Sequence, residues 1–511
     1  MMFHSILFAR AEDRTAQEIS EAPAFFVDLN LDQVVAAITI GKQEYNLKPF
    51  YYAPLHNADA IQYRHEVMRD LEDRTLFESI TAFGAKMRAM REHLAQVDKL
   101  YYRYQKESWF LDAVEIYCDA VSCLAADLGR GDLKSRGFLA FRATVADYVA
   151  SDHFTALVAE TEELRADLAA VRYCFLIKGN TVKVRRYESE RDYSVDVERT
   201  FERFKQGAVK DYTVRLLTGP DMNHVEAQVL DLVARLHTDL FAHLDDYCAR
   251  SHGYLDETIG TFDREVQFYV AYLEYVASFR RAGLKFSYPR IADESKEVYD
   301  YEGYDLALAR KLILENSPIV CNDFHLRDRE RIIVVSGPNQ GGKTTFARTF
   351  GQLHYLASLG CPVPGREAQL YLCDRLLTHF EQAEDLQNLR GKLEDDLVRI
   401  HDILDQATPC SVVIMNEILT STTLQDAISL GKKVMGKIID LDLLCVYVTF
   451  LDELAAMSEK TVSMVSTVAP DDPTVRTFKI LRRPPDGLSY ALSIAEKHRL
   501  TFHQLAERLD S

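Results

Sequence analysis

The chain has 511 residues, of which 47% are hydrophobic and 27% charged, proportions typical of globular proteins, and its length predicts several domains. A net charge of −18 argues against a generic nucleic-acid coat protein but allows a local basic patch. No apolar run is long enough for a bilayer span, and the N-terminal apolar stretch is too short for a signal peptide. Nine scattered cysteines predict reduced thiols. We therefore expect a cytoplasmic protein with no membrane partner.

The first part of the chain, residues 1–150, predicts a mostly helical domain. Leu76–Gln105 is charged, periodic and free of proline, which predicts one long packed helix. Its aromatic residues Tyr101, Tyr102 and Tyr104 are interpreted as core or interface packing.

A β-hairpin is predicted next, at residues 173–188. Two short strands flank a Gly179-Asn180 turn, and Val182 and Val184 alternate with basic residues. From Arg172 to Arg215 eleven basic and seven acidic residues give a local charge of +4. Local positive charge in an otherwise acidic chain predicts contacts with DNA phosphates. The alternative is a hairpin whose mixed charges are only solvated, and the charge pattern taken alone favours that alternative. The candidate DNA-binding residues are Lys178, Lys183, Arg185 and Arg186.

Helices resume after the hairpin. Ala227–Ala249 and Asp263–Gly283 are long and amphipathic, and Gly283 is a plausible helix end. A domain boundary is expected near Pro289.

The strongest motif follows at Arg331–Phe346. The β-branched run Ile332–Val335 predicts a buried strand, and a helix is predicted from Thr344 onward. Between them lies a full GxxxxGK[ST] match, which predicts that ATP and Mg²⁺ bind here. Glycines let backbone amides approach phosphates, the lysine reaches the β- and γ-phosphates, and the threonine ligates Mg²⁺. The candidate ATP-binding residues of this stretch are Gly337, Pro338, Asn339, Gln340, Gly341, Gly342, Lys343, Thr344 and Thr345.

A second strand, Ser411–Met415, ends in Asn416-Glu417. A carboxylate at such a strand end can orient or deprotonate an attacking water, so Glu417 is the candidate catalytic residue. Asn416 stands where Asp is usual and is the second candidate metal residue beside Thr344; its neutral amide predicts weaker Mg²⁺ binding. A simple strand-end turn is the alternative.

These segments together resemble the ATPase of the MutS mismatch-repair family. The resemblance covers Asn316–Leu509, and its residues depart from the family pattern at Asn416, at Phe450, where His is usual, and at Gly391-Lys392, where Ser-Thr is usual. The resembling segments are residues 336–350, 356–370, 383–404, 416–427 and the closing segment Leu488–Glu496.

The resemblance implies a multidomain fold. Residues 1–150 would form an N-terminal segment and helical core, residues 151–220 a clamp-like insertion with the hairpin, and residues 221–292 lever helices. Residues 293–511 would form an α/β P-loop NTPase domain of ABC type. We expect a short MutS-like chain that lacks the mismatch-recognition and connector domains.

The resemblance also assigns further site residues. Ile319, Val320 and Asn322 would contact the adenine, with Ile319 in place of the usual aromatic. The signature segment Arg390, Gly391 and Lys392 would reach ATP held by a partner subunit, in a homodimer formed through the ATPase domain.

The expected function is a dimeric DNA-binding ATPase, an ATP-dependent clamp of mismatch repair or other DNA repair or recombination. Hydrolysis is expected to be slow because of Asn416 and Phe450. Two alternatives stay open: an ATP-binding switch or scaffold with little hydrolysis, and a nucleotide kinase.

Overall fold

The computed structural model describes residues 3–10, 21–179, 181–191, 196, 199–200, 222–381, 391–472 and 474–485. The chain forms two compact units. Unit 1 contains Arg74–Leu133 and Leu139–Asp263, and unit 2 contains Phe3–Asp73, Lys134–Phe138 and the chain from Arg264 onward. None of the described helices is both long and apolar enough to cross a membrane.

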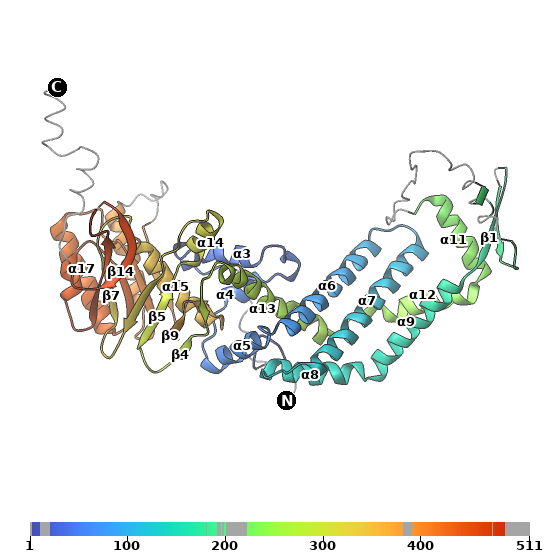
Figure 1. Cartoon of the computed structure of the whole chain (residues 1–511), viewed down its shortest axis with the longest axis horizontal. Helices are drawn as coiled ribbons and strands as arrows, with labels where there is room; N and C mark the ends of the chain where they lie inside the picture. The colour runs from blue at the N-terminus through green and yellow to red at the C-terminus, as the bar shows by residue number, and fades with distance from the viewer. Residues whose placement is uncertain are drawn as a thin grey trace, which may run out of the picture. The chain divides into compact units, whose positions relative to one another are not determined.

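Unit 1 is helical apart from one hairpin (Figure 1). Two helices, α8 and α13, belong partly to each unit. The elements are α6 (Arg74–Val97), α7 (Arg103–Arg130), α8 (Arg136–Val149), α9 (Asp152–Ala170), β1 (Tyr173–Lys178), β2 (Thr181–Arg186), α11 (His224–Leu236), α12 (Thr238–Arg250), η2 (Ser251–Gly253) and α13 (Glu257–Arg281).

Two of the helix predictions for this unit were wrong in length. The single helix expected over Leu76–Gln105 is interrupted between Val97 and Arg103, so α6 and α7 pack against each other as a helical hairpin. Tyr101, at this interruption, is 87% exposed and does not pack in a core. The helix expected over Ala227–Ala249 is likewise divided at His237, whose φ and ψ of −124° and 49° are not helical. In both places tertiary packing overrides a helical sequence pattern.

Unit 2 combines helices with strands. Its elements are α2 (Phe25–Asp28), α3 (Leu31–Ile38), η1 (Gln43–Tyr45), α4 (Lys48–Tyr52), α5 (Ala58–Asp70), β3 (Phe286–Ser287), β4 (Arg290–Ala292), β5 (Val298–Gly303), α14 (Leu306–Leu314), β6 (Asn322–Leu326), β7 (Ile332–Ser336), α15 (Lys343–Ser358), β8 (Val363–Pro364), β9 (Glu367–Tyr371), β10 (Leu376–His379), α16 (Lys392–Gln406), β11 (Val412–Asn416), α17 (Leu424–Leu441), β12 (Leu444–Val448), η3 (Asp452–Ala456), β13 (Thr461–Val468) and β14 (Arg476–Arg482).

The main sheet of unit 2 has the order β10-β11-β12-β7-β13-β14. Its first five strands are parallel, and β14 pairs antiparallel with β13. A second, mixed sheet has the order β4-β9-β5-β6. The coarse fold prediction, a helical N-terminal region followed by an α/β domain, is confirmed.

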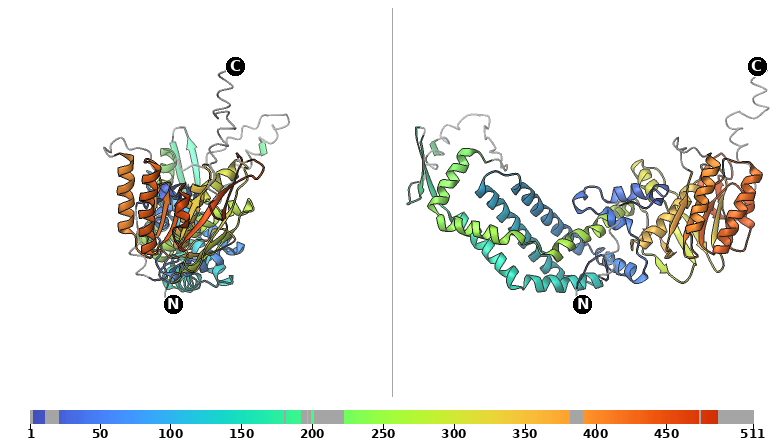
Figure 2. Two further views of the ribbon diagram at one scale, coloured as in Figure 1. Left: turned by 90° about the vertical axis from the view of Figure 1, so that its left-hand side faces the viewer. Right: turned by 180° about the vertical axis from the view of Figure 1, so that it is seen from behind.

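Helices cover both faces of the main sheet. One face, which includes Val413, Met415 and Tyr447, packs on α16 and α17, and these two helices lie side by side there (Figure 2). The other face packs on α15, because a β-carbon at Gly351 of α15 would lie 2.7 Å from Cδ1 of Ile414. Alternate residues of β11 therefore point to opposite helical layers.

The N-terminal segment of unit 2 packs on α15. Nε2 of Gln352 donates to the carbonyl of Leu29 at 2.8 Å, and the Tyr355 hydroxyl donates to the carbonyl of Tyr51 at 2.8 Å. The ring of Phe26 meets Tyr355 edge to face, 5.2 Å between centroids. The segment from α2 to α4 thus packs with the α/β part of the chain.

Candidate functional site

The glycine loop, residues 337–342, joins the carboxyl end of β7 to the amino end of α15. Gly337 and Gly342 have φ angles of 113° and 92°, which other residues rarely adopt. A β-carbon on Gly341 would lie 2.2 Å from Oγ of Ser466, and that hydroxyl donates to the Gly341 carbonyl at 2.7 Å. Ser466 on β13 therefore packs directly behind the loop and fixes its backbone.

Lys343 begins α15 and is 4% exposed. Its Nζ donates to the carbonyl oxygens of Gly337 and Pro338 at 3.0 and 3.3 Å and to Oδ1 of Asn339 at 3.2 Å. It also lies 3.5 Å from Oε1 of Glu417. Burial lowers the pKa of Lys343, and the negative charge of Glu417 opposes that shift. The loop thus holds a buried ammonium group among oxygens that an anion could replace.

Asn416 and Glu417 lie at the carboxyl end of β11. Glu417 has φ 51°, a left-handed conformation that is uncommon for residues other than glycine, and its amide donates to the Val448 carbonyl at 3.0 Å. Asn416 is 6% exposed, and its Oδ1 has no hydrogen-bond partner among the described residues. Because buried polar atoms are nearly always paired, this oxygen indicates a place where a ligand or its hydration shell fits.

Two cavities meet beside these residues. The loop cavity, about 230 Å³, is lined by Leu308, Gln340, Gly341, Gly342, Lys343, Thr344, Thr345, Glu417 and Phe478. The side cavity, about 600 Å³, is lined by Val27, Asp28, Thr344, Arg348, Phe380, Glu381, Asn416 and Glu417. Thr344 and Glu417 line both cavities. Together these cavities have the size of a small-molecule site.

The donor atoms around this junction suit a hard cation. Thr344 offers a hydroxyl, Asn416 an amide oxygen and Glu417 a carboxylate, and Mg²⁺ prefers oxygen ligands. The described residues contain no group of three His, Cys, Asp or Glu side chains that could hold a metal alone. This composition fits Mg²⁺ that arrives with a nucleotide, because such sites take most remaining ligands from phosphates and water.

The residues expected near the adenine are not among those that line these two cavities. Ile319 and Val320 are half-buried in the segment before β6 and line neither cavity. The Asn322 amide bridges β6 to β14: Nδ2 donates to the Phe478 carbonyl at 3.1 Å and Oδ1 accepts from the Ile480 amide at 2.8 Å. Its polar atoms are therefore committed to the backbone of β14.

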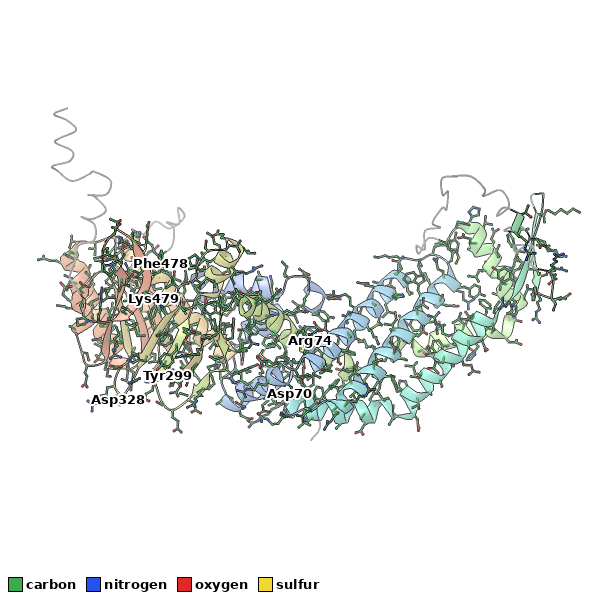
Figure 3. All side chains as sticks on the ribbon, in the orientation of Figure 1. Asp70, Arg74, Tyr299, Asp328, Phe478 and Lys479 are labelled. Carbon is green, nitrogen blue, oxygen red and sulfur yellow. The ribbon has the colours of Figure 1, made fainter. Side chains whose placement is uncertain are left out.

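Phe478 is the residue of β14 whose carbonyl accepts the hydrogen bond from Asn322. Its φ of 59° is left-handed, its side chain is 48% exposed, and it lines the loop cavity. Figure 3 labels Phe478 and its neighbour Lys479 on β14. Phe478 was missed in the sequence because no motif marks an aromatic residue on a late edge strand.

The signature segment is only partly described. Gly391 is the N-cap of α16, and Lys392 is its first residue. The ammonium group of Lys392 pairs with Glu381 of the same chain. Arg390 and the closing segment Leu488–Glu496 lie outside the described residues.

The basic residues of the hairpin divide between its two faces. The register pairs Lys178 with Thr181, Leu176 with Lys183 and Cys174 with Arg185. Since paired residues share a face, Lys178, Lys183 and Arg185 lie together and Arg186 lies opposite.

Two of these four side chains already have partners. Nε of Arg186 donates to the Leu236 carbonyl at the end of α11 at 3.0 Å, and Arg185 lies 2.6 Å from Oε1 of Glu190. Lys178 and Lys183 are exposed. The Asn180 position of the turn lies outside the described residues.

Comparison with known proteins shows what the α/β part of unit 2 is similar to. Residues 333–505 match the family model described as MutS domain V. The DNA mismatch repair protein MutS of Chlorobaculum tepidum is 25% identical over 329 residues, which cover 63% of this chain and 35% of that protein. The chain therefore contains a region similar to MutS domain V. The MutS of Orientia tsutsugamushi is 30% identical over 196 residues, which cover 37% of this chain and 22% of that protein. The chain thus matches about a third or less of the length of these relatives.

At this site, the structure brings together residues that sequence patterns treat separately. Thr344 from the start of α15 and Asn416-Glu417 from the carboxyl end of β11 line one cavity, together with Asp28 and Arg348. Ser466, Asp28 and Arg348 were not among the predicted site residues, because their positions depend on strand order and long-range packing. Phe450, expected at a family position after β12, is 52% exposed.

Proposed function

We propose that unit 2 contains a P-loop ATPase of ABC type that binds ATP with Mg²⁺ and couples its turnover to DNA held by the hairpin of unit 1. The observation that carries this proposal is the convergence of Lys343, Thr344 and Glu417 on one cavity behind a glycine loop. The match to MutS domain V supports it.

The glycine loop would bind the phosphates. Its backbone amides and the amino end of α15 favour negative charge. Lys343 would exchange its contacts with the loop oxygens for contacts with the β- and γ-phosphate oxygens. A buried charge of this kind acts more strongly than an exposed lysine, because little water screens it.

Glu417 would act as the general base or as the group that orients the attacking water. Its carboxylate lines both cavities and its backbone is fixed by Val448, so it would hold a proton acceptor beside the phosphate chain. Thr344 and Asn416 would hold Mg²⁺, which when bound offsets phosphate charge. Because Asn416 contributes no charge, we expect slow turnover.

A homodimer formed through the MutS domain would complete the site. Gly391 and Lys392 begin α16, whose amino end would face ATP on the partner.

DNA would be held through its phosphates by the hairpin. Lys178, Lys183 and Arg185 share one face, so they form the part of the predicted basic patch that one duplex could contact together. Such contacts position a protein without reading sequence. The role would be in mismatch repair or in other DNA repair or recombination, and similarity to two DNA mismatch repair proteins MutS supports the first of these.

A second function is favoured by one observation, the neutral Asn416 at the metal side of the site. The protein would then be an ATP-binding switch or scaffold that hydrolyses little ATP. Both functions require nucleotide binding, and they differ in turnover.

One experiment tests the proposal and separates the two functions. ATP binding and hydrolysis by the full chain are measured without DNA and with duplex, mismatched, branched and single-stranded DNA. The proposed ATPase predicts turnover that at least one DNA changes. Binding without turnover under all conditions supports the switch, and no ATP binding contradicts both.

A further inference from the structure

The side cavity beside the nucleotide site carries more acidic than basic groups. Three carboxylates and one guanidinium line it, those of Asp28, Glu381, Glu417 and Arg348. Glu417 lies 3.5 Å from the ammonium group of Lys343, and Glu381 pairs with Lys392. Within the part of the chain that the structure describes, the Asp28 carboxylate has a hydroxyl partner but no basic one.

Asp28 is held at this cavity from two sides. Its Oδ2 accepts a hydrogen bond from Oγ1 of Thr378 at 2.6 Å, and its backbone carbonyl accepts one from Nε of Arg348 at 2.9 Å. Arg348 lies one helical turn after Thr344 on α15, so both side chains leave the same face of that helix. The main chain of Asp28 is thereby tied to the helix that begins with the glycine loop.

The hydrogen bond with Thr378 places the Asp28 carboxylate at the carboxyl end of the main sheet. Thr378 is the partner of Ile414 across the parallel pair β10–β11, and Asn416 lies two residues farther along β11. Neighbouring strands lie about 4.8 Å apart and each residue advances about 3.3 Å. A carboxylate bonded to Thr378 therefore lies at the carboxyl end of the sheet beside the Asn416 amide, and both residues line the side cavity.

The Asn416 side chain lacks the negative charge that Asp28 can supply. The Asn416 side chain is neutral, 6% exposed and unpartnered at Oδ1 among the described residues. An amide oxygen can accept from a metal-bound water, but it offers no negative charge to a divalent cation. Mg²⁺ in nucleotide sites keeps several waters and takes one or two carboxylates.

We propose that Asp28 supplies the carboxylate charge for the divalent cation of the bound nucleotide, through water, at the position where Asn416 contributes only an amide. The N-terminal segment of unit 2 is then part of the metal site and not only a packing element. This inference rests on the proposed nucleotide binding and adds a residue from the opposite end of the sequence to it.

The test measures metal binding directly. Mn²⁺ is titrated into the full chain saturated with a non-hydrolysable ATP analogue, and free Mn²⁺ is followed by electron paramagnetic resonance. Asp28→Asn is expected to weaken Mn²⁺ binding by about tenfold, the lower range for residues that support a metal through a ligand. Affinity for the analogue in EDTA is expected to stay within about twofold, since the Lys343 contacts are unchanged.

A double-mutant cycle with Asn416→Asp sharpens the result. Asn416→Asp is expected to restore Mn²⁺ affinity in the Asp28→Asn background and to raise it much less in the wild-type background, because one carboxylate then already serves the cation. Glu381→Gln is the matched control: it removes a carboxylate that lines the same cavity but is paired with Lys392, so its effect on Mn²⁺ affinity should stay below about threefold.

Thermal unfolding of each variant checks that it folds. If Asp28→Asn does not fold, Thr378→Val replaces it, because this variant keeps the carboxylate but removes the hydroxyl that orients it, and the same loss of Mn²⁺ affinity is expected. Unchanged Mn²⁺ affinity in a folded variant that binds the analogue normally overturns the role of Asp28. An equal loss in Glu381→Gln also overturns it. No analogue binding by the wild-type chain overturns the proposed function instead.

Discussion

The glycine loop and the β1–β2 hairpin are both candidate phosphate-binding regions, but they hold their positive charge in opposite ways. Lys343 is 4% exposed and fixed by three oxygens of its own loop. Lys178 and Lys183 are exposed on a two-stranded ribbon. A buried, preorganised charge binds one anion strongly, whereas exposed charges act additively and are screened by salt. Single substitutions should therefore matter at the loop, and only combined substitutions at the hairpin.

The largest effect is expected at Lys343. Lys343→Ala should weaken ATP binding by about 100-fold, or ~3 kcal/mol, because it removes a charge-assisted contact in a site that excludes water. Isothermal titration with ATP measures it, and the thermal unfolding midpoint serves as the folding control. ATP affinity within about threefold of wild type in a folded variant would show that the loop is not a phosphate site.

Gly341→Ala tests whether the loop backbone is preorganised. The added methyl would meet Ser466 Oγ at 2.2 Å and the Pro338 carbonyl at 2.9 Å, so the loop must shift, at a cost of about 1–3 kcal/mol in stability and at least about tenfold in ATP affinity. Gly436→Ala on α17 is the matched control, since nothing lies within 4 Å of that β-carbon. It should raise helix stability by up to ~1 kcal/mol and leave ATP binding unchanged. Equal behaviour of the two variants would contradict the tight packing of Ser466 against the loop.

The DNA-binding prediction for the hairpin depends on which face each basic side chain occupies. Reversing Lys178, Lys183 and Arg185 to Glu should weaken binding to all duplexes by about tenfold at low salt and reduce the slope of log affinity against log salt by about 3. Arg186→Ala should change DNA affinity by less than about twofold, because this side chain already contacts the Leu236 carbonyl on the other face. Fluorescence anisotropy with labelled duplex at two salt concentrations measures the DNA affinity of each variant and its salt dependence. A larger loss in Arg186→Ala than in the triple variant would move the DNA to the opposite face.

The smallest effect is a pH dependence of ATP binding. Burial lowers the pKa of Lys343, despite the opposing charge of Glu417. Its positive charge is fully present at pH values below that lowered pKa and is lost as the pH rises through it, at lower pH than for an ordinary lysine near 10.4. ATP phosphates, with a last pKa of about 6, no longer titrate above about pH 8. We therefore expect ATP affinity to fall between roughly pH 8 and 10, before an ordinary lysine would have lost most of its charge. An affinity that is constant over this interval would indicate that Lys343 does not contact the nucleotide.

The two regions also differ in what sequence could predict. The strand Ile332–Ser336, the loop and the start of α15 are contiguous, so the motif specifies their local geometry. Asp28 and Ser466 reach the same site from distant elements, and strand order decides their positions. The hairpin strands were predicted correctly from the Gly179 turn and period-two alternation, but the partners of Arg185 and Arg186 were not, since those contacts come from residues outside the strands.

Helix boundaries were predicted less well for a related reason. The segment from Leu76 to Gln105 has helical periodicity throughout, yet the chain reverses between Val97 and Arg103 because α6 packs on α7. No glycine or proline marks that reversal. Tertiary packing thus determines features that neither propensity nor periodicity carries.

The most direct test of ATP turnover at this site is a comparison of wild-type protein with Glu417→Gln. ATP retention and phosphate release are measured together, with DNA present. The variant should keep ATP affinity within about threefold, since Lys343 and the loop are intact, and should release phosphate at least about 100-fold more slowly, as expected when a general base is removed. A Glu417→Gln variant that releases phosphate at the wild-type rate would contradict the account.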